Sequence, residues 1–262
     1  IDQCKRLWND IVDMQKKEKA GHFVGSIVNI AEQAMPTGVQ KYMIIDGQQR
    51  MTTLTLLLLA LRDYAIKNPS DTTINSRRID NMLLKNEYEV GDERYKLLLT
   101  ETDRDILISL VEEKPITEGT RSRLIENYKF FAGKLADKEI QPAEVYESIG
   151  KLQIVNITLD RAVDDAQAIF ESLNSTGKEL SESDLIRNYV LMGLEPSEQT
   201  YVYEHLWRPM EQLFVYETQG TVMDAFFRHY LTMKLSRIPK QGRVYEEFKL
   251  YHLNCEFGSI RE

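Results

Sequence analysis

The sequence predicts an α+β protein in which a small mixed sheet near the start of the chain precedes a large helical portion. Three short segments, 22–30, 39–46 and 151–160, alternate apolar with polar residues or are rich in β-branched residues, as strands are. Most of the remaining chain carries apolar residues at helical spacing between charged ones. A sheet that begins near the start of the chain and is joined by a distant strand, with helices elsewhere, is an α+β arrangement.

The first elements follow from local signals. Residues 2–19 place apolar side chains on one helical face among charges, and Gly21 is a suitable helix end. The segments 22–30 and 39–46 are separated by a stretch with Pro and Gly, which predicts an antiparallel hairpin. The second strand leads directly into a leucine-rich helix over 50–67.

The rest of the chain is expected to be mainly helical. One strand-like piece covers 94–100, Thr102 and Asp105 form a weak capping box for the next helix, and a further helix covers 121–135. After the strand at 151–160, helices continue to about residue 252. The expected organisation is an α/β part over 1–70 whose sheet is completed by 151–160, a mostly helical insertion over 71–150, and a helical part over 161–262.

Composition excludes several classes of protein. The two cysteines, Cys4 and Cys255, lie near opposite ends with no metal-like spacing, which argues against a disulfide scaffold and for a reducing compartment. The net charge of −8 argues against binding nucleic acid over the whole surface. No signal peptide or membrane span is evident, so a cytoplasmic protein without a membrane partner is expected. Because the first residue is Ile1, the chain is expected to begin inside a longer gene product.

The stretch IIDGQQRMTTL, residues 44–54, gathers polar residues where a strand meets a helix. Gly47 permits a sharp turn, and the first N–H groups and positive dipole of the helix favour an anion there. Arg50 adds a planar fork suited to phosphate. A plain structural interpretation stays open, in which Asp46 caps the helix and Arg50 pairs with a surface acid. The candidate phosphate-binding residues are Gly47, Gln48, Arg50, Thr52 and Thr53.

A second unusual stretch, FESLNSTGKELSESDLIRN, covers residues 170–188. Gly177 is placed to end one helix, and a serine starts the next with Asp184 in its first turn. Packing explains the apolar residues of this helix–loop–helix. It does not explain why Asn174, Asp184, Arg187 and Asn188 occur together, so these are candidate site residues.

The two stretches resemble the signatures of one family. IDGQQRMTTL matches a DGQQR motif, FESLNSTGKELSESDLIRNYVL matches the pattern F-x-x-x-N-x-x-G-x-x-L-x-x-x-D-L-I-[KR]-N, and FVGSIV and YKLLLTETDRD also resemble family segments. The family is that of the N-terminal domains of GmrSD-type modification-dependent restriction enzymes and related phage-defence proteins. The resemblance covers most of residues 7–195.

This resemblance implies a ParB-like and sulfiredoxin-like start of the fold, around a strand–Gly–helix core, with a helical part appended. It also implies binding or hydrolysis of a nucleoside triphosphate, with Mg²⁺, linked to cleavage of modified foreign DNA. By position, the nucleotide or catalytic motif carries over to Asp46, Gly47, Gln48, Gln49 and Arg50, and the second motif to Asn174, Gly177, Asp184 and Asn188.

Two departures from the family pattern bear on the site. The upstream I-P-x-x-Q-R-x-Y-x-W segment is reduced here to IDQCKRLWNDI. The histidines have no His-Asn-His spacing; they are His22, His205, His229 and His252. Nuclease activity is therefore expected in a His-Asn-His domain or partner subunit outside this chain, and contact with DNA through the full-length protein.

Three functional hypotheses follow. The first is a nucleotide-binding regulatory module, and NTP hydrolysis by it stays open. The second is a DNA-binding or modification-sensing module in which Arg50 and Lys41 contact phosphates. The third is a ParB-like nuclease with a metal ion near Asp46, Asp184 or the adjacent pair Asp164 and Asp165.

Overall fold

The computed structural model of the chain consists of two compact units, Ile1–Asp160 and Arg161–Glu262. It describes the residues in the ranges 1–32, 38–99, 101–117, 119–120, 122–160, 169, 181–192, 194, 196–213 and 219–255. The α+β class expected from the sequence is confirmed.

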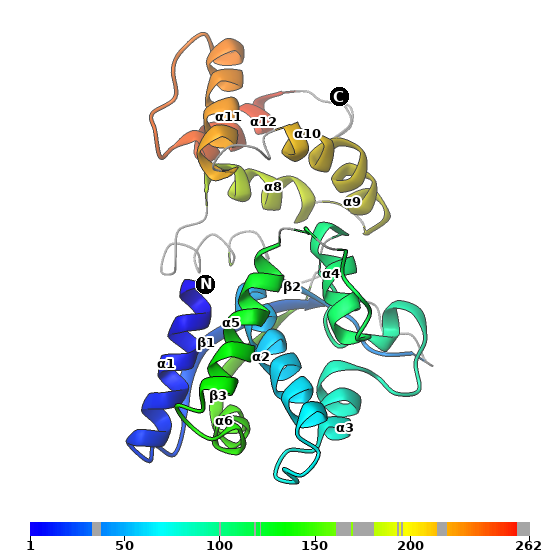
Figure 1. Cartoon of the computed structure of the whole chain (residues 1–262). Coiled ribbons are helices and arrows are strands. Elements are labelled where there is room, and N and C mark those ends of the chain that lie inside the picture. The colour runs from blue at the N-terminus through cyan, green and yellow to red at the C-terminus, as the bar shows by residue number, and fades with distance from the viewer. Residues whose placement is uncertain are drawn as a thin grey trace. The chain divides into compact units, whose positions relative to one another are not determined.

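The first unit combines three strands with helices and short helical turns (Figure 1). In chain order its elements are α1 (Asp2–Lys16), β1 (His22–Ala31), β2 (Tyr42–Asp46), α2 (Gln48–Lys67), α3 (Ser76–Ile79), the π-helical turn η1 (Asp80–Leu84), the 3₁₀ turn η2 (Gly91–Arg94), α4 (Glu101–Val111), α5 (Arg123–Asp137), α6 (Pro142–Ile149) and β3 (Leu152–Leu159).

The strands form one mixed sheet in the order β2-β1-β3. β1 and β2 pair antiparallel, with Val28 opposite Asp46, as the predicted hairpin requires. β3 pairs parallel with β1 along almost its whole length, from His22 opposite Leu152 to Ile30 opposite Leu159. The strand distant in sequence therefore completes the sheet beside the strand nearest the start.

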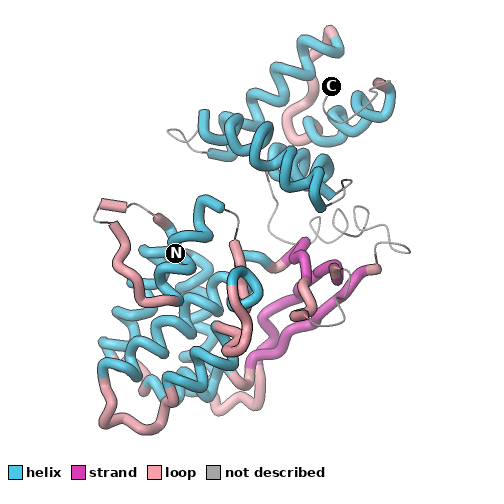
Figure 2. Tube along the Cα trace, turned by 90° about the vertical axis from the view of Figure 1, so that its right-hand side faces the viewer, coloured by secondary structure: helices cyan, strands magenta, loops and turns pink. Residues whose placement is uncertain are grey.

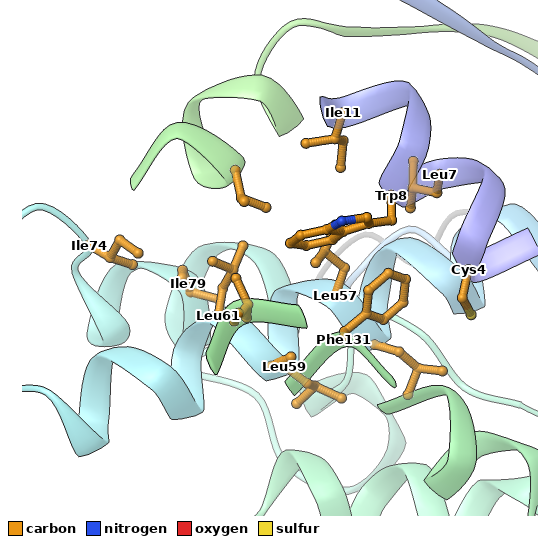
Figure 3. Packing of buried hydrophobic residues seen from close by; sticks show 14 of the residues in the cluster. Cys4, Leu7, Trp8, Ile11, Leu57, Leu59, Leu61, Ile74, Ile79 and Phe131 are labelled. Carbon is orange, nitrogen blue, oxygen red and sulfur yellow. The ribbon is translucent and has the colours of Figure 1, made fainter. Parts of the chain in front are cut away.

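Helices cover one side of this sheet (Figure 2) and share a large apolar core. Figure 3 shows Trp8 and Ile11 of α1 near Leu57 of α2 and Phe131 of α5. These side chains are almost completely buried. The leucine-rich helix α2 is apolar on most of its circumference, which is typical of a helix that lies inside a fold. The core thus fixes the position of α2, whose first residues carry the DGQQR motif.

Two details of the prediction were wrong. Residues 94–100 were expected to be a strand, but their described part begins with the last residue of η2 and makes only a single isolated bridge, between Lys85 and Tyr95. Leu97 and Leu99 instead pack against the core, so their pattern reflects burial and not sheet pairing. Thr102 was expected to cap a helix, but α4 already begins at Glu101, so Thr102 lies within it.

A buried charge network joins the far half of α2 to α4. Arg62 has only 1% of its surface exposed. Its Nη1 donates to the carbonyl of Val111 at 2.7 Å, and its Nη2 donates to the carbonyl of Leu110 at 2.9 Å. It also pairs with Asp63 at 2.8 Å and with Asp80 at 3.1 Å. Arg62 thereby supplies donors to the last carbonyls of α4, which have no partner inside that helix.

The second unit is helical over its described residues, as expected from the sequence. Its core joins apolar residues of several helices, including Ile186, Trp207, Phe227 and Val244. Its elements are α8 (Glu182–Met192), α9 (Pro196–Val202), the π-helical turn η3 (Tyr203–Trp207), α10 (Arg208–Leu213), α11 (Gln219–Leu235) and α12 (Val244–Asn254).

Acidic side chains of this unit cap the starts of neighbouring helices. Asp224 of α11 accepts a hydrogen bond from the Ser183 N–H at 2.7 Å. Glu182 of α8 accepts one from the Tyr245 N–H at 2.6 Å, which satisfies the first turn of α12. The residue at the N-cap position itself, Arg243, makes no such bond. Side chains of α11 and α8 therefore hold the N-termini of α8 and α12, respectively.

The carboxyl group of Glu182 is expected to make the stability of the second unit depend on pH. Partial burial raises the pKa of the Glu182 carboxyl above its usual 4.5, although the Tyr245 N–H opposes this shift. A raised folded-state pKa means that the folded unit holds the proton more tightly than the unfolded chain. The stability contributed by protonated Glu182 is therefore lost as pH rises from about 4.5 through the raised pKa.

We expect Glu182→Gln to keep the acceptor oxygen and to remove this part of the pH dependence. Glu182→Ala loses the cap and should cost about 1 kcal/mol at neutral pH. Thermal unfolding of both variants between pH 4 and 8 checks the prediction. If Glu182→Gln is as destabilising as Glu182→Ala at pH 7, the capping role is wrong.

Candidate functional site

At the junction between β2 and α2, the N-cap position of the helix is occupied by a glycine. β2 ends at Asp46, Gly47 takes the left-handed conformation with φ of 93°, and α2 begins at Gln48. Gly47 has no side chain to cap this end, no side chain of another described residue does so by a hydrogen bond, and no acidic residue lies in its first turn. The positive end of a helix of 20 residues is thus available to an anion. Asp46 does not cap the helix, contrary to the plain structural interpretation.

Arg50 lies one turn into α2 and crosses the backbone of β1. Its Nη1 donates to the carbonyl of Ser26 and, at 3.3 Å, to Oδ2 of Asp46. A Cβ atom at Gly25 would lie 2.8 Å from the Arg50 Nε, and one at Gly47 would lie 3.2 Å from its Nη1. Two glycines therefore make room for this one guanidinium.

The guanidinium is held on one side only. Among the described residues, the contacts of Arg50 with acceptors all go through Nη1. Its side chain is 38% exposed, and that of Asp46 is 39% exposed. The N–H groups on Nε and Nη2 make no hydrogen bond to a described residue, so a ligand can accept from them. The surface-ion-pair interpretation accounts for the Asp46 contact but not for the two glycines.

The remaining polar residues of the motif already make hydrogen bonds, either within α2 or to α1 and β2. Gln48 donates to the Ile44 carbonyl at 2.9 Å, and the side-chain oxygen of Gln49 accepts from Gln3. Thr52 and Thr53 donate their hydroxyl protons to the carbonyls one turn before them, at 2.9 and 2.7 Å. Thr53 is also buried, whereas Gln48 and Gln49 are exposed.

Two asparagines near the same junction were not singled out from the sequence. Asn29 of β1 is only 4% exposed, and its Nδ2 donates to Oδ1 of the exposed Asn156 of β3 at 2.6 Å. The Oδ1 atom of Asn29 is buried without a hydrogen-bond partner. A signal was present in the sequence, because both strands contain the tetrapeptide Ile-Val-Asn-Ile with a polar residue inside an apolar strand.

The second motif lies only partly in the described residues: Asn174 and Gly177 fall outside them. Ser181 caps the start of α8, and its Oγ accepts the Asp184 N–H at 3.1 Å. Asp184 pairs with Arg187 at 3.1 Å, and Arg187 also pairs with Glu211 at 3.2 Å. Asn188 lies half-buried on the same helix. These contacts fit a structural role for Asp184 and Arg187, and a site at the second motif stays a prediction.

A ready-made metal cluster is absent from the part of the chain that the structure describes. No three His, Cys, Asp or Glu side chains there converge closely enough to hold an ion. Asp164 and Asp165 lie outside that part. Asp46 offers a single half-exposed carboxylate, which fits Mg²⁺ held mainly by phosphate oxygens and water. In the described helices, no stretch is long and apolar enough to cross a membrane.

Comparison with known proteins bears on the origin of this site. A search of curated proteins gives no match. The sequence profile of the GmrSD restriction endonuclease N-terminal domain, however, matches residues 1–191. The matched range includes the junction at Gly47 and all of α8 except its last residue. The chain therefore belongs to the family of GmrSD restriction endonuclease N-terminal domains.

Proposed function

We propose that the start of α2 binds the phosphates of a nucleoside triphosphate and that the chain acts as a nucleotide-binding regulatory module of a modification-dependent restriction system. The observation that carries the proposal is the glycine N-cap of α2 beside Arg50, whose guanidinium contacts described residues only through Nη1. Backbone N–H groups and the helix dipole favour a phosphate at such an end. A guanidinium with unused N–H groups adds charge-assisted hydrogen bonds to it.

The motif also supplies what hydrolysis of the triphosphate needs. Asp46 would hold Mg²⁺ directly or through water, and the ion would neutralise phosphate charge there; otherwise Asp46 orients Arg50 through their 3.3 Å contact. Exposed Gln48 and Gln49 orient the phosphates or the water that attacks the terminal phosphorus, which releases a diphosphate and inorganic phosphate. Phosphoryl transfer depends mainly on such positioning and on neutralising charge. In this proposal DNA is contacted and cut through other parts of the full-length protein or a partner subunit.

A DNA backbone is the weaker candidate for the phosphate at this site. Lys41, the nearby cation that would extend a DNA contact, is paired with Glu93 at 3.1 Å. The chain also carries a net charge of −8, which disfavours long-range attraction to DNA. Direct cleavage of DNA by this chain is supported least, because no carboxylate or histidine cluster gathers around Asp46 in the described residues.

We expect Arg50→Ala to weaken nucleotide binding about 10- to 100-fold, since a charged hydrogen bond to phosphate contributes about 1.5–3 kcal/mol. Calorimetric titration with ATP, GTP, CTP and UTP in the presence of Mg²⁺ measures the effect. Arg104→Ala is a matched control, because Arg104 of α4 pairs only with Asp92 among the described residues. If the wild-type protein shows no heat with any of the four at millimolar concentration, the proposal fails.

Phosphate release from the same four nucleotides tests hydrolysis separately from binding. We expect Gln49→Ala to lower the rate more than the affinity, because its proposed role is to orient water. A salt series with modified and unmodified duplex DNA distinguishes the DNA alternative. Salt-dependent DNA binding that Arg50→Ala abolishes, without any nucleotide binding, would favour that alternative.

A further inference from the structure

The amide of Asn29 is a polar group that the fold buries but does not satisfy. Its Nδ2 is bound to Asn156, and its Oδ1 has no partner although the residue is only 4% exposed. Burying an acceptor without a donor costs free energy, so an atom of this kind in a strand calls for an explanation. Asn156 is exposed, and its Nδ2 makes no hydrogen bond to another described residue. The pair therefore offers a ligand one acceptor, Oδ1 of Asn29, and one donor, Nδ2 of Asn156.

The register of the sheet places this pair next to the start of α2. Side chains two residues apart on a strand share a face, so Asn29 lies on the face of Gly25 and Ile27. Asn156 is opposite Ile27 and shares that face. A Cβ at Gly47 would lie 3.0 Å from the Ile27 Cγ1, so the N-cap of α2 sits over Ile27.

The direction of α2 then decides what lies ahead of its N-terminus. Gly47, just before the helix, lies beside Ile27, and the guanidinium of Arg50 in its first turn lies beside Gly25. The first turn of α2 therefore lies on the Gly25 side of Ile27, and its free N–H groups point the other way along β1, toward Asn29. Two residues of a strand span about 7 Å, so the amide pair lies next to the proposed phosphate position.

We propose that Asn29 and Asn156 bind the ribose of the nucleotide, an inference that rests on the proposed function. The ribose is attached directly to the phosphates, so it is the part of the ligand that reaches a pair adjacent to the helix N-terminus. A ribose hydroxyl donates to Oδ1 of Asn29, and a hydroxyl oxygen accepts from Nδ2 of Asn156. The unsatisfied acceptor gains its donor when the ligand binds, and the chain thereby distinguishes ribonucleotides from deoxyribonucleotides.

Calorimetry with four ligands tests this assignment: a ribonucleoside triphosphate, its 2′-deoxy and 3′-deoxy analogues, and inorganic triphosphate. We expect the wild-type protein to bind at least one deoxy analogue about three- to tenfold more weakly, as the loss of one neutral hydrogen bond predicts. Asn29→Leu and Asn156→Ala should abolish that preference and leave the affinity for inorganic triphosphate unchanged. Gln153→Ala is the matched control, because this exposed residue lies on the opposite face of β3.

The outcomes separate the two proposals. A wild-type protein that binds neither nucleotide nor inorganic triphosphate overturns both. Nucleotide binding without discrimination against either deoxy analogue, or with discrimination that both asparagine variants retain, overturns the ribose assignment alone. If the asparagine variants lose a preference for one base but still discriminate against the deoxy analogues, the ribose assignment is also overturned, and the asparagines contact the base instead. If Asn29→Leu does not fold, the exposed Asn156→Ala decides.

Discussion

Replacing Arg62 by methionine is expected to lower the free energy of unfolding of the first unit by about 3–5 kcal/mol, which is typical when one partner of a buried ion pair is removed. The Arg62 side chain is 1% exposed, while those of Asp63 and Asp80 are 20% and 23% exposed. Methionine fills much of the volume, so most of the loss comes from charges and carbonyls left without a donor. The carbonyl of Val111 is among these groups, whereas that of Leu110 keeps the N–H of Glu113 at 3.4 Å.

The charge of Arg62 is maintained by its surroundings. Burial lowers its pKa, but the carboxylates of Asp63 and Asp80 more than offset this, and the net pKa is raised. Tyr128 completes the network by donating to Asp63 at 2.5 Å. Burial and that hydrogen bond raise the pKa of Tyr128, so it remains a donor throughout the neutral range.

Urea unfolding of Arg62→Met, Arg62→Lys and the control Arg104→Met measures the contribution. The control breaks a more exposed pair with Asp92 and should cost less than about 1 kcal/mol. Lysine keeps the charge but loses the fork that reaches two carbonyls and two carboxylates, so an intermediate loss is expected. A loss for Arg62→Met no larger than that for the control would contradict a structural role of the network.

Local signals were sufficient to predict the junction at Gly47, because strand alternation, a glycine and a leucine-rich helix follow one another within a few residues. They were not sufficient for Arg62, which looks like an ordinary surface charge in the stretch LALRDY. Its partners at Asp80 and Val111 come from segments brought close only by folding. Long-range pairing of this kind is not encoded in any periodic pattern.

The same limit explains the error at 94–100 and the omission of Asn29. Leu97 and Leu99 alternate as in a strand, yet the bridge at Lys85 lies next to a π-helical turn that offers no extended partner. Asn29 reads as an isolated polar residue until the parallel pairing of β1 with β3 brings it to Asn156. Parallel partners are far apart in sequence by necessity, so this contact follows from the topology alone.

Replacing Gly25 by alanine is expected to impair the site without removing any of its polar groups. Gly25 has φ of +121°, a conformation that costs other residues about 1–3 kcal/mol. Its new Cβ would lie 2.8 Å from the Arg50 Nε and 3.1 Å from the Cζ, so the guanidinium must move. We therefore expect a loss of stability of about 2–3 kcal/mol and a loss of nucleotide affinity close to that of Arg50→Ala.

Gly119→Ala separates backbone strain from displacement of Arg50. Gly119 also has a positive φ, of +85°, but its Cβ position has no heavy atom of another described residue within 4 Å, its chain neighbours aside. It should lose stability by backbone strain alone and bind nucleotide as the wild-type protein does. In an Arg50→Ala background, Gly25→Ala should weaken binding no further, because the side chain it displaces is gone. Additive losses of affinity in the double variant would show that Gly25→Ala acts on the ligand by a route other than the displacement of Arg50.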